Sequence, residues 1–432
     1  MDLMKNEKVR AYMELVCGQI KFKDIHENIK EELLDHIDNI VEEDMEKNLT
    51  LEEAIDGAIK QMGDPYILGQ ELNKVHKPKP EWSILALTFI FTLIGIVALY
   101  VMSIQGLWTD WRIKGMIKNS AIMFVAGIAI IVGLYFFDYR KFKPFSKYLY
   151  IGTSLLSIFV EGHYRIFNIE TTVFVYRVSR NLAYITPFLY AIALSGMFSE
   201  DRWQKGKRFS NLIILFLPMI ISLRLATMTP IIMYFTMALV LIFVSKGSVK
   251  YIFGSIGVSA IAAFLSIINY PYKIDRLKAI LNPFKNGYMD VQLRNLISSA
   301  GLLGDRTNID KIEKPILDLP EMHTDYIFSY IIYAFGWLIG ISIITLSIVF
   351  FIRLIKTAKS IEDSYGRLLV STFSSLLIIQ FVYNILMALG LAPVAGISMP
   401  FISYGTVLNM VNMIMIGIIS SVYRRKNIVE KI

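Results

Sequence analysis

The stretch "LDLPEMHTDYIF" spans Leu317–Phe328, and an apolar run follows it that continues to Leu354. Asp325 lies at the boundary between a polar segment and this apolar run. A helix needs about 20 predominantly apolar residues to cross the hydrocarbon core of a bilayer. An ionisable side chain at the edge of such a helix costs free energy unless it has a partner or a chemical task. The stretch therefore predicts a membrane helix with a candidate functional acid where the helix begins.

The whole chain has the composition of a membrane protein. Hydrophobic residues make up 55% of its 432 residues, and its mean hydropathy is +0.51. Such values exceed those of soluble domains, so we predict an all-α, polytopic membrane protein with about ten transmembrane helices. The predicted spans are 83–104, 119–137, 145–160, 181–198, 209–224, 229–245, 251–269, 325–354, 368–391 and 402–422.

Charge divides the chain into two parts. Residues 1–80 contain 11 Lys and Arg against 18 Asp and Glu, a net charge of −7, whereas the remainder contains 33 against 18, a net charge of +15. The change falls near "KPKPEW" (Lys77–Trp82). We predict a small acidic, cytoplasmic helical domain at 1–78 and a transmembrane domain at 79–432. The acidic balance of the first part argues against nucleic-acid binding there.

The acidic part has the pattern of short helices. "ENIKEELLDHIDNIVEEDMEK" (27–47) places apolar residues at helical spacing opposite acids. Thr50 and Glu53 form a capping-box pattern at the start of a further helix, which Gly63 ends. The motifs "EELLDHI" and "GDPYILGQEL" resemble prefix domains that precede some permease-like proteins of Gram-positive bacteria. A solvated helical bundle and a docking or regulatory module both remain open for this part.

The distribution of cations predicts the orientation in the membrane. Short loops on one side of the predicted spans are rich in Lys and Arg, for example "YRKFKPFSK" (139–147) and "DRWQKGKR" (201–208). By the positive-inside rule these loops, and both termini, lie in the cytoplasm of a multi-pass cell-membrane protein. The long loop 270–324 then lies outside and carries eight Lys and Arg side chains. Asp325 faces the same outer side.

A second unusual stretch is "APVAGISMPFISYG" (392–405), in which Pro and Gly interrupt an apolar region. Irregular backbone at membrane depth is tolerated where it is buried in protein or lines a cavity. A purely structural kinked loop and a functional loop are both open interpretations of this stretch. It lies on the predicted outer side, as Asp325 does.

Three stretches resemble the SEDS family (shape, elongation, division and sporulation proteins, the RodA/FtsW/SpoVE group). They are "DRLKAILNP" (Asp275–Pro283), the passage from "SSAGLLG" (298–304) to "LPEMHTDYIF", and "ISMPFISYG" (Ile397–Gly405). The resemblance implies a peptidoglycan glycosyltransferase that polymerises lipid II in cell-wall synthesis linked to cell shape, division or sporulation. Such proteins usually work beside a single-span transpeptidase, which this chain lacks.

The chain departs from the family pattern at several positions. The family's G-E-E after H-T-D-F-I-F is Ile332–Ala334 here, so Tyr333 and Ala334 stand where two acids are expected. The second glycine and the two serines after S-Y-G are replaced by Thr406–Leu408. "LRLATMT" (Leu223–Thr229) lacks the acid of the family's Q-P-D-x-G-T.

The chemistry implied by the resemblance is attack of a sugar hydroxyl on an anomeric carbon that carries a polyprenyl diphosphate. The resemblance makes Asp325 the essential acid, and a carboxylate there suits the general base that takes the hydroxyl proton. Positive charge must stabilise the departing diphosphate, and the candidates are Arg276, Lys278 and Arg294. The other predicted substrate-binding residues are Glu321, His323, Pro400, Ser403 and Gly405. The sequence offers no clear metal-ligand set, and a divalent cation that assists the diphosphate stays an open alternative.

Two other functions fit the same architecture. One is an enzyme-free flippase for a lipid-linked precursor, and the other is a catalytically inactive scaffold with the acidic part as its docking module. Retention of His323, Thr324 and Asp325 favours the enzyme over the scaffold, because a scaffold has no need of an acid there. The replaced acids at Tyr333 and Ala334 favour the scaffold.

Overall fold

The computed structural model describes residues 3–104, 110–166, 173–199, 208–222, 229–247, 288–304 and 321–426, with scattered positions between 250 and 264. Asn48, His76, Lys79 and Val394 fall outside this description, and for some residues, chiefly 110–114 and 160–180, only the backbone is described. The chain divides into two compact units. The first comprises Met1–Pro80 with Ile361–Asp363 and Tyr423–Ile432, and the second comprises Glu81–Ser360 and Ser364–Val422.

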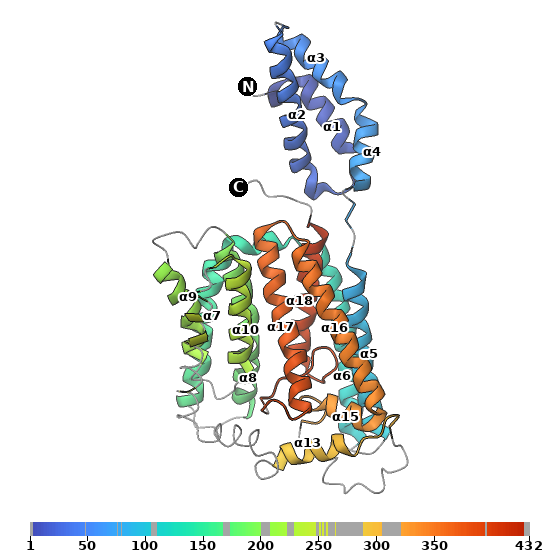
Figure 1. Cartoon of the computed structure of the whole chain (residues 1–432), viewed down its shortest axis with the longest axis vertical. Helices are drawn as coiled ribbons and strands as arrows, with labels where there is room; N and C mark the ends of the chain where they lie inside the picture. Colours follow the sequence, from blue (N-terminus) through green and yellow to red (C-terminus); the bar gives the residue numbers. More distant parts are fainter. Residues whose placement is uncertain are drawn as a thin grey trace. The chain divides into compact units, whose positions relative to one another are not determined.

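The amino-terminal unit contains four α-helices around one apolar core (Figure 1). They are α1 (Glu7–Gly18), α2 (His26–Glu46), α3 (Leu51–Met62) and α4 (Pro65–Val75), with short 3-10 helices at Leu3–Lys5 and Lys23–Ile25. The α2 residues expected to face inward are buried, among them Ile29, Leu33, Ile37 and Val41. Spacing of about 3.6 residues per turn brings them to one face, and burying that face stabilises the bundle.

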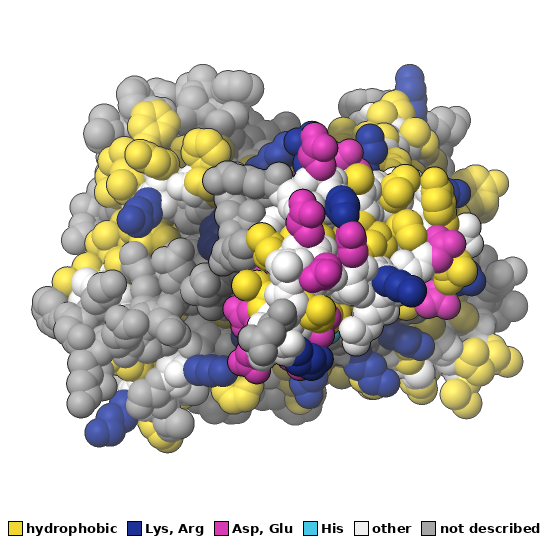
Figure 2. All heavy atoms as spheres, turned by 90° about the horizontal axis from the view of Figure 1, so that it is seen from above, with side chains coloured by type: hydrophobic (Ala, Val, Ile, Leu, Met, Phe, Trp, Pro, Cys, Tyr) yellow, Lys and Arg dark blue, Asp and Glu magenta, His cyan; other side chains and the backbone are white. Residues whose placement is uncertain are grey.

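The predicted capping box of α3 is confirmed. The Thr50 hydroxyl accepts from the amide of Glu53 at 3.4 Å, and the Glu53 carboxylate accepts from the amide of Thr50 at 3.0 Å. The Thr50 hydroxyl also donates to the Glu53 carboxylate at 2.6 Å, and this bond, with the smaller effect of the bond from the Thr50 amide, lowers the pKa of Glu53 because both stabilise the charged form. Gly63 follows the helix with a φ of 83°, which favours glycine. In the view from above, acidic and basic side chains are mixed over the surface of this unit (Figure 2).

All the regular secondary structure described in the second unit is helical (Figure 1). Its first half contains α5 (Trp82–Ile104), α6 (Asp110–Phe136), the 3-10 helix Tyr139–Phe145, α7 (Ser146–Ile166), α8 (Val173–Phe198), α9 (Arg208–Ser222) and α10 (Thr229–Val244). Its second half contains α13 (Tyr288–Ser298), α15 (Ile327–Phe335), α16 (Trp337–Lys359), α17 (Ser364–Ala388) and α18 (Thr406–Arg424).

Five helices among the described residues are long and apolar enough to cross a membrane. They are α5, the Gly115–Phe136 part of α6, α16, α17 and the Val407–Arg424 part of α18. Shorter apolar helices lie at Tyr184–Phe198, Ser210–Ile221 and Thr229–Val244. The chain is therefore an all-helical, multi-span membrane protein, as predicted. Most of the predicted seventh span, 251–269, lies outside the described residues.

The central helix of this unit is α17, which packs against α8, α10 and α16. Within its most apolar window 72% of residues are buried, against 6% for α6. A helix that is buried all round must satisfy its polar side chains internally. Ser371 and Thr372 do so by donating to carbonyl oxygens of the preceding turn, those of Arg367 and Leu368.

The predicted single span 325–354 is wrong, because the chain breaks between α15 and α16. Gly336 separates them with a φ of 87°, a left-handed conformation that ends a right-handed helix. A Cβ added at Gly336 would lie 2.7 Å or less from the backbone of Leu302, so only glycine fits there without a shift. At about 1.5 Å per residue, α15 spans only about 14 Å and cannot cross the bilayer core alone.

The predicted outer loop 270–324 is described only in part. Its described residues include α13, which lies across the lower end of the upright helices in Figure 1 and packs on α15. Gly301 and Leu302 then accept hydrogen bonds from the amides of Trp337 and Leu338 at 3.1 Å. These contacts join the end of the predicted loop to the first turn of α16.

Candidate functional site

Asp325 is presented by a tight turn that precedes α15. The turn begins at Glu321, whose φ of 62° is unusual for a residue with a side chain. The Glu321 carbonyl accepts from the amides of Thr324, Asp325 and Tyr326 at 3.0, 3.0 and 3.3 Å. Its carboxylate also accepts from the Thr324 hydroxyl at 2.7 Å. In the described turn, Glu321 therefore shapes the backbone that holds Asp325.

The segment 389–405 between α17 and α18 has no regular secondary structure, yet side chains anchor its backbone. Tyr383 donates to the carbonyl of Pro393 at 2.9 Å, and Thr229 of α10 donates to that of Ala395 at 2.5 Å. Ser403, 3% exposed, accepts from the amide of Met399 at 2.8 Å. Such bonds offset the cost of taking irregular backbone out of water.

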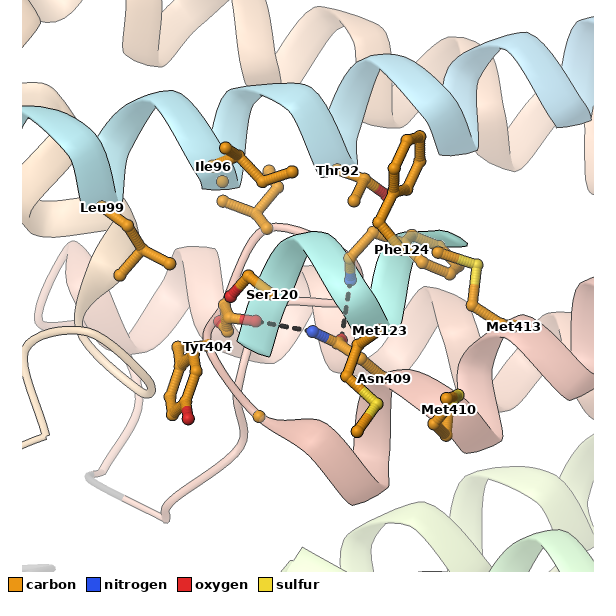
Figure 3. Close-up of a pocket in the computed structure, with 15 residues that line it drawn as sticks. Thr92, Ile96, Leu99, Ser120, Met123, Phe124, Tyr404, Asn409, Met410 and Met413 are labelled. Atoms are coloured by element: carbon orange, nitrogen blue, oxygen red, sulfur yellow. Dashed lines mark hydrogen bonds between the residues drawn. The ribbon is translucent and has the colours of Figure 1, made fainter. Parts of the chain in front are cut away.

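Asn409, in the first turn of α18, holds the end of the same segment. Its Nδ2 donates to the carbonyl of Ser403 at 2.6 Å, and its Oδ1 accepts from the amide of Phe401 at 3.1 Å (Figure 3). Phe401 has a φ of 64°, a conformation that costs free energy for a residue with a side chain. The side-chain amide of Asn409 thus holds the strained backbone turn around Pro400 in place through these two hydrogen bonds.

The two segments meet at Asp325. The amide of Tyr404 donates to the carbonyl of His323 at 2.8 Å, and their rings lie 5.7 Å apart. A Cβ on Gly396 would lie 3.4 Å from Oδ2 of Asp325 and 3.7 Å from the hydroxyl of Tyr184. Asp325 is only partly buried. A carboxylate in this position is held by rigid backbone while it keeps some access to solvent.

A small, open pocket adjoins this region. Figure 3 shows side chains of α5, α6 and α18 around it, and the segment from Phe401 to Gly405 forms one wall. Its polar lining residues are Thr92, Ser120, Ser403, Tyr404 and Asn409, and its apolar ones include Ile96, Leu99, Met123, Phe124, Met410 and Met413. Methionine side chains adapt to irregular apolar ligands.

The structure brings several predicted site residues to segment 389–405. Arg294 of α13 donates from Nη2 to the carbonyl of Gly390 at 3.2 Å. His323 and Asp325 contact the segment as described above, and Pro400, Ser403 and Gly405 belong to it. Around Gly405 a Cβ would meet nothing within 4 Å, so close packing does not require glycine there. Arg276 and Lys278 lie outside the described residues.

The two residues that stand where the family pattern has acids, Tyr333 and Ala334, lie in α15. Tyr333 is buried and Ala334 is partly buried. The neighbouring Ile332 packs on Gly340 of α16, where a Cβ would lie 2.7 Å from its side chain. Among the described residues no three His, Cys, Asp or Glu side chains are grouped to hold a metal ion, so we derive no step through a divalent cation.

Sequence reasoning singled out Gly396 but missed the side chains that anchor the site, chiefly Asn384, Asn409 and Thr229. One available signal was polarity, because uncharged amides within apolar spans are uncommon unless they bond to something. Asn384 and Asn409 both lie in predicted spans. Their partners are backbone atoms distant in sequence, which no local pattern indicates.

The fold and these motifs agree with comparisons against known proteins. Residues 81–428 match the model of a family of cell cycle proteins, the FtsW/RodA/SpoVE family. The chain therefore belongs to this SEDS family, and the predicted resemblance is confirmed. Residues 1–80 lie outside the match, so the resemblance to permease prefix domains stays a prediction.

The relatives are distant, and the first two described here cover most of the chain. Stage V sporulation protein E of Bacillus subtilis is 25% identical over 372 residues, which cover 81% of this chain and 98% of the relative. A probable peptidoglycan glycosyltransferase FtsW of Geobacter metallireducens is 24% identical over 83% of this chain and 98% of its own. The peptidoglycan glycosyltransferase RodA of Treponema pallidum is 28% identical over 41% of this chain and 42% of its own.

Solved structures share the fold. The rod shape determining protein RodA of Thermus thermophilus superposes with a TM-score of 0.57 at 19% identity, covering 81% of this chain and 98% of that one. A chain from a peptidoglycan synthase complex, described as coordinating polymerization and crosslinking, gives a TM-score of 0.63 at 18% identity with the same coverage. Both matches support the helical membrane architecture.

Proposed function

We propose that this protein is a peptidoglycan glycosyltransferase that polymerises lipid II at the outer face of the cytoplasmic membrane. The observation that carries the proposal is the position of Asp325. Its carboxylate stays partly accessible, lies beside Gly396, and sits on a turn that is bonded into segment 389–405. Relatives named as peptidoglycan glycosyltransferases supply the reaction class.

In this proposal Asp325 is the general base. Its carboxylate takes the proton of a sugar hydroxyl while that oxygen forms a bond to the anomeric carbon of a second lipid-linked sugar. The bond from that carbon to the diphosphate breaks, the electron pair leaves with the diphosphate, and the configuration inverts. A carboxylate held by a rigid turn acts without reorganising at the moment of reaction.

The leaving diphosphate requires positive charge. Arg294 supports this role because it lies at the start of segment 389–405, bonded to Gly390. Its planar guanidinium matches the geometry of phosphate oxygens. Arg276 and Lys278 complete the proposed set on the basis of sequence alone. Glu321, His323, Pro400, Ser403 and Gly405 are proposed to line the substrate path.

The pocket beside Phe401–Gly405 is proposed to hold part of the hydrocarbon tail of the lipid substrate. It is lined by α5, α6 and α18, which are candidate membrane spans, so hydrocarbon is the ligand class available to it. Replacing Ile96 by Trp fills the pocket and should raise KM for lipid II. The neighbouring Val97, half-exposed and outside the lining, is the matched control, and Val97→Trp should leave KM unchanged.

The deciding experiment is polymerisation of lipid II by the purified full chain. Asp325→Ala and Asp325→Asn should reduce the rate by about 10²–10⁴-fold, the usual contribution of a general base. The exposed acid Glu362, replaced by Gln, serves as the control and should retain full activity. Full-rate glycan synthesis by Asp325→Ala would reject the catalytic role. Lipid flipping in liposomes without polymerisation would instead favour a transporter.

A single-span transpeptidase is the proposed partner, because the structural relative comes from a peptidoglycan synthase complex described as coordinating polymerization and crosslinking. Both termini are proposed to lie in the cytoplasm, with the amino-terminal helices as a cytoplasmic domain at 1–78. Reporter fusions to each terminus test the orientation. A reporter active outside the membrane at either end would contradict it.

A further inference from the structure

Two buried amide side chains lie one turn apart on α17. Gln380 and Asn384 are both 0% exposed within an apolar membrane span. A polar side chain in such surroundings costs free energy unless its donors and acceptors find partners. Both amides donate to backbone, but Gln380 does so within its own helix, to the carbonyl of Leu376 at 2.9 Å, whereas Asn384 reaches backbone outside α17.

Gln380 makes a reciprocal bond with another side chain. Its Nε2 donates to Oδ1 of Asn412 on α18 at 3.2 Å, and its Oε1 accepts from Nδ2 of Asn412 at 3.2 Å. The pair joins two helices and touches neither of the segments that meet at Asp325. Its role is packing between α17 and α18.

Asn384 instead bonds to the backbone of both segments of the candidate site. Its Nδ2 donates to the carbonyl of Asp325 at 2.8 Å and to the carbonyl of Ile397 at 2.7 Å. Only the nitrogen of the amide can face two carbonyl oxygens, so these bonds fix the orientation of the side chain. Among the described residues no donor reaches its Oδ1.

We propose that Asn384 is a positioning residue that clamps the Asp325 turn to segment 389–405 and so holds the Asp325 carboxylate beside Gly396. This inference rests on the proposed function for its catalytic consequence. It explains why a central, otherwise closely packed helix carries an amide at this position. The two N–H donors of this one side chain join the Asp325 turn to segment 389–405, in addition to the bond from the Tyr404 amide to the carbonyl of His323.

The alternatives at this position fail for separate reasons. Leucine approximates the volume but offers no donor, so two carbonyls lose a partner. Aspartate preserves the shape, but an ionised carboxylate only accepts and would face two carbonyl oxygens. Both changes therefore break the two hydrogen bonds. Leucine does so because it has no donor, and aspartate because its charged oxygens repel the carbonyl oxygens.

The test compares Asn384→Leu and Asn384→Asp with the control Gln380→Leu/Asn412→Leu, which also removes buried amides, one from α17 and one from α18. In the full chain, kcat for lipid II polymerisation should fall about 10- to 100-fold in both Asn384 variants, because a reacting group misplaced by about 1 Å loses roughly that much. KM should change little. The control should lose comparable thermal stability but keep its kcat.

A second measurement is independent of activity. Hydrogen–deuterium exchange should accelerate in peptides covering 321–328 and 395–400 in both Asn384 variants, and in neither peptide in the control. The proposed clamp would be overturned if hydrogen–deuterium exchange in these two peptides were unchanged in the Asn384 variants. It would also be overturned if these variants lost no more kcat than the control. If the wild type does not polymerise lipid II while exchange rises as expected, the proposed function fails and the clamp stands.

Discussion

Replacing Gly95 by Ala tests the contact between α5 and the segment that carries Ser403. Gly95 faces the backbone of Ile402, whose carbonyl carbon and Cα both lie 2.9 Å from the place of an added Cβ, with the carbonyl oxygen closer still. Ordinary contact begins at 3.4 Å. The two backbones must therefore separate by at least about 0.5 Å, and backbone cannot rotate away as a flexible side chain does.

The magnitude follows from a comparison with Gly133 of α6, where a Cβ meets nothing within 4 Å. Both changes replace a helical glycine by alanine, so both gain about 1 kcal/mol of helix propensity. Only Gly95→Ala also forces overpacking, which typically costs about 1–3 kcal/mol. Gly95→Ala should thus be less stable than Gly133→Ala by about 1–3 kcal/mol.

The assay is equilibrium denaturation of both variants in mixed micelles, followed by lipid II polymerisation. Gly133→Ala should be as stable as the wild type or slightly more stable, with unchanged activity. Gly95→Ala should be less stable and also slower, because the displaced segment forms a wall of the pocket and bonds to His323. Equal stability of the two variants would refute the packing of α5 against Ile402.

Three further predictions concern other parts of the chain. Gly396→Ala should cost about 1–2 kcal/mol of stability, because its φ of 65° is left-handed, and should slow polymerisation more than Gly152→Ala, where a Cβ meets nothing. Burial raises the pKa of the Cys17 thiol, so a maleimide should label native protein at least tenfold slower than unfolded protein, and equal rates would show that Cys17 is accessible. Thr50→Ala should speed amide exchange in α3 at pH 7. Since the pKa of Glu53 is lowered, the part of the cap that its carboxylate makes is present above the ordinary value of 4.5 and is lost as pH falls through the lowered pKa. The bond from the Glu53 amide to the Thr50 hydroxyl does not titrate, so the difference from wild type should shrink in acid to the share of that bond; a difference that does not shrink would contradict this.

Local patterns predicted local structure well. The capping box of Thr50 and Glu53 depends on residues three apart, so the sequence alone indicates it. The positions of the apolar spans can be predicted because each depends only on the composition of about 20 consecutive residues. The break at Gly336 was missed because glycine is common in membrane helices and gives no warning in the middle of an apolar run. What requires glycine there is the backbone of Leu302, on a different segment.

The candidate site was predicted only where its chemistry is carried by short motifs. Asp325 and the stretch from Ile397 to Gly405 stand out in sequence, but their meeting does not, since it depends on the packing of α17 between them. Asn384 contacts Asp325 across 59 positions of the chain. A contact of that range follows from the tertiary fold and from no pattern of spacing.

Asn384 marks how far the Asp325 turn lies from the end of α17. Asn384, which bonds to the carbonyl of Asp325, stands four residues before the end of α17 at Ala388. At about 1.5 Å per residue this is about 6 Å, one helical turn, below the end of that helix. In the proposed mechanism, the attacking sugar hydroxyl therefore meets Asp325 at about the level of this turn of α17 rather than at the end of the helix.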